Sequence, residues 1–202
     1  MKNKKNQQEI SAVNQINVDE MIGKANKRTI NRLANTLSYL ENVKWKSVSF
    51  TIPTEPDPSH RPRRVGAYRM YVPGAAKHQK YFDTFVRPKL NGLFINTPCK
   101  IDVKIFCKTP TSFSDVQKIL AEMGFIRPWA NNGDVDNFLK SVMDQMQPNE
   151  KRGNVGIMSN DFLVIDSHAE EFYSATPRYE VTLTYMVDIP DEIKGIMRIK
   201  EW

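Results

Sequence analysis

Alternating apolar and polar residues mark several segments of the chain as β-strands. The clearest spans residues 100–108, where every second residue is apolar and those between are mostly charged. Because successive side chains of a strand point to opposite faces of a sheet, this pattern predicts one buried and one exposed face. Residues 47–52 and 179–187 repeat the pattern, and the apolar run 162–165 is typical of a further strand. We therefore expect a sheet of about four strands.

A spacing of three to four residues between apolar positions predicts helices between these strands. The strongest pattern starts after Asp134, and its apolar face consists of Val135, Phe138, Leu139, Val142, Met143 and Met146. Residues 75–87 predict a second main helix that Pro88 should kink or end, and residues 113–123 predict a short one. This order of elements favours an α+β fold, in which two main helices pack on a mixed sheet.

The two ends of the chain differ from this central pattern. Residues 1–17 are polar, and residues 19–40 have the apolar stripe of a helix. That helix either docks on the core or binds a partner or a second copy. We expect residues 1–45 to form a polar and helical N-terminal extension, 46–188 a single compact domain, and 189–202 a C-terminal tail.

The charge of the chain is distributed unevenly. The 202 residues have a net charge of +6, which divides into +4 over residues 1–45, +8 over 46–133 and −6 over 134–202. This asymmetry indicates that the basic part binds a polyanion such as a nucleic acid while the acidic part binds a cation. The plain alternative is solvated surface charge.

The cysteines and the hydropathy of the chain exclude some classes of protein. Cys99 and Cys107 are the only cysteines, and no ligand-spaced histidines accompany them, which excludes a disulfide framework and an ordinary zinc knuckle. Cys107 is expected to be a small core residue. The sequence has no apolar run long enough for a membrane helix and no signal peptide, so we expect a cytoplasmic protein without a membrane partner.

A proline-rich segment after the first predicted strand carries the best candidate surface for nucleic acid. It contains Arg61, Arg63 and Arg64, and Arg69 follows between two tyrosines. The guanidinium group presents a rigid fork of donors that matches phosphate, and tyrosine rings can stack on bases. We predict that these four arginines contact DNA. A solvated loop would have the same composition.

Carboxylates gather at the start of the strongest predicted helix. Because its apolar stripe faces the core, Asp136, Lys140 and Asp144 lie on the opposite flank, with Asp134 just before the helix. A return of the chain after this helix can bring Asp161 beside Asp134 and Asp136. Three carboxylates repel one another unless a cation lies among them, and such hard oxygen ligands suit Mg²⁺ or Mn²⁺.

A cation held there suits the hydrolysis of phosphodiesters. It can activate water and neutralise charge on a phosphorane, while Lys140 steadies the phosphate or the attacking water. The structural alternative is that Asp and Asn side chains at the helix start cap free N–H groups, and that Asp136 and Lys140 form an ordinary ion pair one turn apart.

These residues together resemble a known family. The motif Asp134-x-Asp136-Asn137-x-x-Lys140-x-x-x-Asp144, followed by Asn160-Asp161, looks like the signature of the RusA family of Holliday-junction resolvases, many of which are phage-encoded. The Arg61-Pro62-Arg63 loop and the Tyr71-Val72-Pro73 turn are similar to phage-type members. The resemblance covers roughly residues 46–187.

The resemblance implies an enzyme, a metal-dependent endodeoxyribonuclease that hydrolyses Holliday junctions or other branched DNA in recombination and repair. It implies that Asp134, Asp136 and Asp161 are the metal-binding catalytic acids, with Mg²⁺ or Mn²⁺, and that Lys140 is the catalytic lysine. It also implies a homodimer, whose two equivalent sites suit paired nicks in a symmetric junction. The alternatives are a non-catalytic protein that binds DNA structures, in which the carboxylates are only a fold element, and an adaptor that binds partners through its N-terminal helix.

Four residues depart from the family pattern. Asn160 stands where the family commonly has a second aspartate, and Asn132-Gly133 replaces a frequent Lys-Pro before the first aspartate. Glu171 lies where a lysine often follows the third strand. The last two changes remove positive charge near the expected path of the DNA.

Overall fold

The computed structural model describes residues 18–58, 63–65, 69–71, 79–128, 133–149 and 156–199. The chain forms two compact units, and the boundary between them lies between Val43 and Lys44. None of the helices in the described ranges is long and apolar enough to cross a membrane.

The first unit contains two helical segments where the sequence predicted one helix. Residues 18–23 are helical, and α2 (Lys27–Glu41) begins again after a break. Asn26 causes the new start, because its side-chain oxygen accepts a hydrogen bond from the backbone N–H of Thr29 at 2.9 Å. The apolar stripe of α2, Ile30, Leu33 and Leu37, is exposed.

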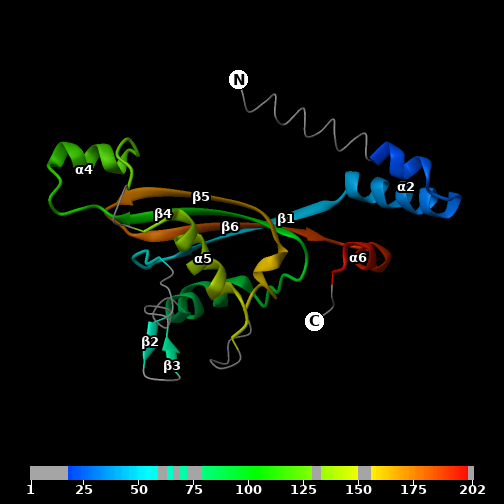
Figure 1. Cartoon of the computed structure of the whole chain (residues 1–202). Coiled ribbons are helices and arrows are strands. Elements are labelled where there is room, and N and C mark those ends of the chain that lie inside the picture. Colours follow the sequence, from blue (N-terminus) through cyan, green and yellow to red (C-terminus); the bar gives the residue numbers. More distant parts are fainter. Residues whose placement is uncertain are drawn as a thin grey trace. The chain divides into compact units, whose positions relative to one another are not determined.

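The second unit is built on a mixed four-stranded sheet (Figure 1). Its strands are β1 (Lys44–Ile52), β4 (Cys99–Lys108), β5 (Val164–Ser174) and β6 (Arg178–Val187), in the spatial order β1-β6-β4-β5. Strand β6 is antiparallel to both of its neighbours, whereas β4 and β5 are parallel. The predicted α+β fold with a mixed sheet of about four strands is confirmed.

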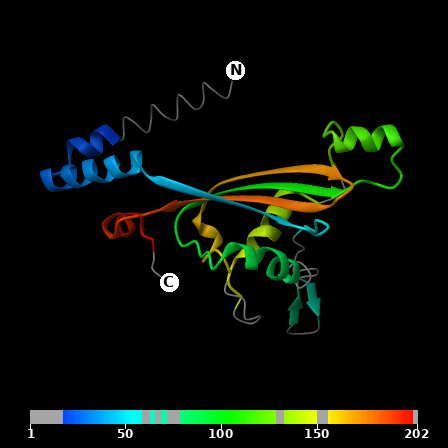
Figure 2. The same ribbon diagram turned by 180° about the vertical axis from the view of Figure 1, so that it is seen from behind.

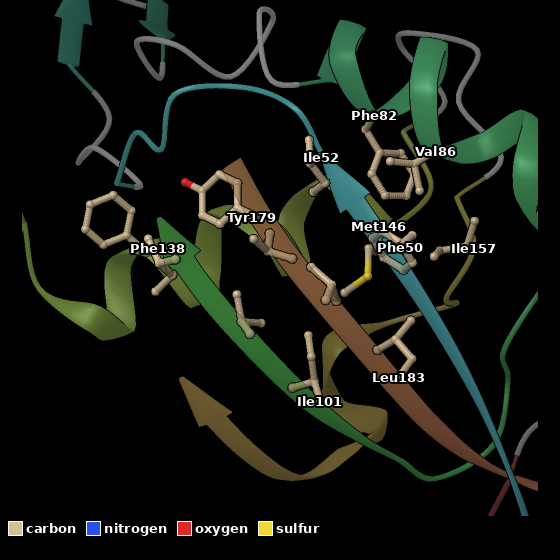
Figure 3. Close-up of a cluster of buried hydrophobic side chains, with 14 of the residues drawn as sticks. Phe50, Ile52, Phe82, Val86, Ile101, Phe138, Met146, Ile157, Tyr179 and Leu183 are labelled. Carbon is tan, nitrogen blue, oxygen red and sulfur yellow. The ribbon is translucent and has the colours of Figure 1, made fainter. Parts of the chain in front are cut away.

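The core fills the space between one face of this sheet and the helices that cover it. Helix α5 (Val135–Met146) and the helical segment 79–90 lie on the same side of the sheet in both views (Figures 1 and 2). Side chains from α5, from the strands and from the segment 79–90 meet in this layer (Figure 3), where Phe138 packs against Tyr179 and Phe50 against Phe82. Two main helices therefore pack on the sheet, as the sequence predicts.

The helical segment 79–90 differs in detail from the helix predicted over residues 75–87. It contains a π-helical turn, η1 (Phe82–Val86), and a 3₁₀ turn, η2 (Arg87–Leu90). Pro88 lies at the start of the 3₁₀ turn, where its missing N–H is not needed, so the helical path continues past it. Residues 75–78 lie outside the described residues.

Other boundaries also differ from the expectations. Strand β5 extends to Ser174 instead of ending near residue 165, because the residues that it turns toward the helices are too small or polar to show an apolar alternation. The expected loop after β1 contains a hairpin of β2 (Arg63–Val65) and β3 (Arg69–Tyr71). Helix α4 (Asp115–Glu122) lies within its predicted range, and the expected tail contains α6 (Asp191–Met197).

Aromatic and guanidinium groups stack on the other face of the sheet. The rings of Phe106 and Phe172 are stacked with their centroids 5.2 Å apart. The guanidinium of Arg127 lies 3.8 Å from the centroid of Phe172, and that of Arg178 lies 3.8 Å from the centroid of Phe106. This stack joins β4, β5 and β6 and fixes which way β5 faces.

Both cysteines are buried in the core and free of disulfides. Burial raises the pKa of the Cys99 thiol to about 11 and that of Cys107 to about 12, the latter with help from the charges of Glu171 and Glu55. Both thiols are therefore neutral at ordinary pH, and the predicted core role of Cys107 is confirmed.

Candidate active site

Gly133, just before α5, lies close to Pro58, from which the chain enters the arginine-rich segment (residues 59–71). Gly133 adopts a φ of +103°, and a Cβ added there would lie 2.7 Å from Cγ of Pro58 and 3.3 Å from Cε2 of Phe138. Proline cannot adopt this φ, so a Lys-Pro pair at residues 132 and 133 would require a different backbone at the start of α5. The backbone N–H of Asp57 donates to the hydroxyl oxygen of Tyr179 at 3.0 Å. This hydrogen bond anchors the chain just before Pro58 to β6.

Asp134 occupies the N-cap position of α5 with an extended backbone, φ −87° and ψ 143°. Its side chain nevertheless makes no capping hydrogen bond to α5. Its Oδ2 accepts only a long hydrogen bond, 3.5 Å, from the side-chain amide of Asn137. The capping explanation therefore does not account for the Asp134 carboxylate.

Asp136 and Lys140 follow on the exposed flank of α5. Asp136 lies in the first helical turn, and its side chain is exposed. Lys140 Nζ lies 3.6 Å from Oδ1 of Asp144, and both side chains are about half exposed. The lysine is thus held over the middle of the helix by a carboxylate one turn further along.

Asp161 lies on the chain between α5 and β5. The pKa of Asp144 is raised mainly by burial, while Lys140 lowers it and the charge of Asp161 raises it. Asp161 begins a 3₁₀ turn, η4 (Asp161–Leu163), which Asn160 caps by accepting the N–H of Phe162 at 3.2 Å. An amide is sufficient for this cap, so Asn160 fills a structural role at the position where the family commonly has an aspartate.

Glu171 is a partly buried carboxylate of β5. In the sheet it is opposite Ile105, whose side chain is buried under the helices, so Glu171 belongs to the helix-covered face. Burial raises the pKa of its carboxyl, and the charge of Asp134 raises it further. Its Oε1 atom is buried without a hydrogen-bond partner.

The direction of α5 follows from the contacts at its two ends. Phe138 near its start packs against Tyr179, which is opposite Ile105 late in β4, whereas Met146 at its end accepts the N–H of Met158, which contacts Cys99 at the start of β4. Helix α5 therefore runs antiparallel to β4 and β5.

No three His, Cys, Asp or Glu side chains converge as a metal site in the part of the chain that the structure describes. The predicted grouping of Asp134, Asp136 and Asp161 around one cation stays a prediction.

The sequence analysis did not predict that Glu171 lies on the helix-covered face of the sheet. It treated Glu171 only as a lost positive charge after a short strand. The signal lies in the two-residue period of Ala169, Glu171 and Tyr173, which extends the strand and places the glutamate on the same face as its buried neighbours.

The predicted DNA-binding arginines fall in or near the β2–β3 hairpin. Arg63 and Arg64 lie on β2 and Arg69 on β3, with Arg63 opposite Tyr71 and Val65 opposite Arg69. Arg61 lies outside the described residues. The contact of these arginines with DNA stays a prediction.

Comparison with known proteins bears on the resemblance. No curated protein matches the chain. Residues 53–184 match the protein family described as Endodeoxyribonuclease RusA. The match covers well over half of the chain, including the arginine-rich segment, α5 and all the carboxylates discussed above. The chain therefore belongs to the RusA endodeoxyribonuclease family.

Proposed function

We propose that this chain is a divalent-cation-dependent endonuclease that hydrolyses phosphodiester bonds in Holliday junctions and other branched DNA, and that it serves DNA recombination and repair in the cytoplasm. Membership of the family implies endonuclease activity on Holliday junctions. The observation that supports the metal dependence is the Asp134 carboxylate, which occupies the N-cap of α5 without capping it, with the Asp136 carboxylate exposed in the first turn. Carboxylate oxygens that are not used by the fold are available to a hard divalent cation.

The chemistry of the side chains fits Mg²⁺ or Mn²⁺. All the candidate ligands are carboxylates, which these hard cations prefer to sulfur ligands. Mg²⁺ is commonly bound by one or two carboxylates, with water and substrate phosphate completing its shell, so a pair of carboxylates is sufficient. Glu171 Oε1 supports the fit, because it is a buried oxygen without a hydrogen-bond partner.

In this proposal Asp134, Asp136 and Asp161 are the metal-binding catalytic acids. A bound cation would supply a polarised phosphate and a water of lowered pKa. The Lys140 ammonium, held against Asp144, donates to a phosphate oxygen and stabilises the charge that develops there. Because Cys99 and Cys107 are buried neutral thiols, neither serves as the nucleophile, and water fills that role.

The nuclease domain comprises residues 46–188 in this proposal, and two copies form a homodimer. Two sites related by a two-fold axis match the symmetry of a four-way junction. Exposed apolar side chains on and after α4 (Val116, Ile119, Leu120, Met123 and Phe125) support self-association, because monomers rarely expose such groups together.

The test compares a synthetic four-way junction with a linear duplex of the same sequence, in Mg²⁺, Mn²⁺ or EDTA. We expect cleavage of the junction in either cation and none in EDTA, measured as products on a denaturing gel. Junction binding without cleavage in either cation would contradict the proposal and favour the non-catalytic DNA-binding protein.

Replacing Arg61, Arg63 and Arg64 by Ala should weaken junction binding and flatten its dependence on salt. Each lost phosphate contact removes about one unit from the slope of log affinity against log salt. The measurement is a series of binding titrations at several salt concentrations.

The matched control replaces Lys100, Lys104 and Lys108, which are exposed on the other face of β4, and removes the same three charges. If this control flattened the slope as much as the arginine variant, the arginines would contribute only net charge, and the predicted contact would be wrong.

A further inference from the structure

We propose that α2 pairs antiparallel with α2 of a second copy of this chain. The inference rests on the proposed homodimer, and it names a surface of the first unit that joins the two copies. Of the roles that the sequence allows for this helix, it favours binding of a second copy over docking on the core.

Helix α2 buries little of its own surface. Within Lys27–Glu41, all of which the structure describes, Thr36 is the one buried residue. Ile30, Leu33 and Leu37 are 41, 36 and 48% exposed. A helix of 15 residues is marginal in water unless packing stabilises its apolar face. We therefore expect this face to pack against a partner.

The apolar face of α2 has the spacing of a seam between paired helices. Ile30, Leu33, Leu37 and Leu40 follow one another at intervals of three, four and three residues, which are the a and d positions of two heptads. A repeat of this period keeps one seam turned toward a second helix along its whole length. Because two copies related by a two-fold axis present the same seam to each other, a second α2 fits it.

The charges at the two ends of α2 favour the antiparallel direction. Lys27 is the first residue of the helix and Glu41 the last, and both are exposed. The helix has no acidic residue in its first turn and no basic residue in its last turn. Since the N-terminus of a helix is positive and its C-terminus negative, both charges are unfavourable toward their own helix.

Antiparallel pairing turns these charges into favourable ones. When Ile30 packs against Leu40 of the partner subunit, the same register brings Lys27 beside Glu41 of the partner subunit, and this happens twice. Each charge then also lies near the helix end of opposite sign. A parallel pair would instead gather both lysines at one end and both glutamates at the other.

The proposed dimer of the second unit would make this pairing stronger than two short helices achieve alone. Only residues 42 and 43 separate α2 from β1. Two copies that are already joined therefore hold their α2 helices at an effective concentration in the millimolar range. Pairing of α2 in turn stabilises the dimer.

Cysteine cross-linking of the full-length protein tests the pairing and its direction. Ala34 borders the seam, and in the antiparallel register it faces Ala34 of the partner subunit. Ala34→Cys should therefore be joined into dimers by a short bismaleimide, measured on a denaturing gel. Ile30→Cys should not, because the two copies of Ile30 lie about 15 Å apart along the antiparallel pair.

The matched control for cross-linking is Asn35→Cys. Asn35 is adjacent to Ala34 and exposed, and the helical period places it on the side of α2 opposite the seam. It should remain monomeric on the gel. Cys99 and Cys107 are buried, so the introduced cysteine is the one that reacts in the folded protein.

A charge exchange tests the ion pairs. Glu41→Lys converts both pairs from attractive to repulsive, and it should weaken the dimer on the order of tenfold at low salt, measured by sedimentation. A lysine is favourable at a helix C-terminus, so this loss does not come from a damaged helix. Adding Lys27→Glu to the same chain should restore the affinity of the wild type.

The inference is overturned if Ala34→Cys is cross-linked no better than Asn35→Cys, if Ile30→Cys is cross-linked in preference to it, or if the charge exchange restores no affinity. Junction cleavage gives a separate answer on the proposed function. A protein that cleaves but is not cross-linked at Ala34→Cys keeps the nuclease and loses the pairing of α2. A protein that is cross-linked there but never cleaves keeps the pairing and contradicts the nuclease.

Discussion

Replacing Asp136 by Asn is expected to abolish metal-dependent cleavage of a four-way junction while junction binding survives. The Asp136 side chain is exposed in the first turn of α5, so an isosteric amide leaves the core intact. The amide removes the negative charge that a cation and its bound water require. We expect cleavage to fall at least about 100-fold in single-turnover assays. Binding is measured by gel shift in EDTA.

Asp115→Asn provides the control for this variant. Asp115 also lies in the first turn of a helix, α4, where it complements the helix dipole. It therefore reproduces the loss of a favourable charge at a helix start without touching the candidate site. Cleavage by Asp136→Asn within a few-fold of Asp115→Asn would show that Asp136 is not a metal-binding acid.

Replacing Gly156 by Ala should produce the largest loss of stability among the glycine variants of the described core. Gly156 has a φ of +74°, and a Cβ there would lie 2.6 Å from the backbone nitrogen of Pro148 and 2.8 Å from the carbonyl oxygen of Met146. That carbonyl accepts the N–H groups of Ile157 and Met158 at 2.8 and 3.1 Å. Since backbone atoms obstruct the new methyl group, the end of α5 must move away from the chain that leads to Asp161.

The expected cost is about 3 kcal/mol in the free energy of unfolding, measured by urea denaturation. Gly92→Ala separates the cost of the positive φ from the cost of the close backbone approach. Gly92 has the same φ of +74° as Gly156, and nothing lies within 4 Å of the added Cβ. That control should lose only about 1 kcal/mol, the conformational cost alone. Equal losses in the two variants would mean that the close approach at Gly156 relaxes without penalty.

The fold was largely predictable from periodicity, because most of its strands and α5 bury one complete face. Strand β4 alternates buried and exposed residues along its whole length, so its pattern in the sequence is unambiguous. Strand β5 is an edge strand whose exposed and partly buried residues obscure the period, and only its first residues were recognised. The β2–β3 hairpin was missed because three-residue strands are too short to show a period.

The site was predictable in its residue types and less so in its geometry. The polar flank of α5 follows from the helical period, which places Asp136, Lys140 and Asp144 together. Which carboxylate of β5 meets which turn of α5 depends on the direction in which the helix crosses the sheet, and no local pattern encodes this. The place of Glu171 on the helix-covered face of β5 therefore emerged only from the structure.

Strand order has a consequence for how this chain folds. Only residues 175–177 separate β5 from β6, yet these antiparallel strands do not pair, because β4 lies between them. The short link crosses the end of β4, where the N–H of Thr109 donates to the carbonyl of Ser174 at 3.2 Å. A local hairpin of β5 with β6 forms from nearby residues and so competes kinetically with the native sheet, whose β4–β5 contacts must close the loop of residues 109–163. We therefore expect the insertion of β4 between the two strands to limit the rate of folding, and the same step brings Glu171 opposite Ile105.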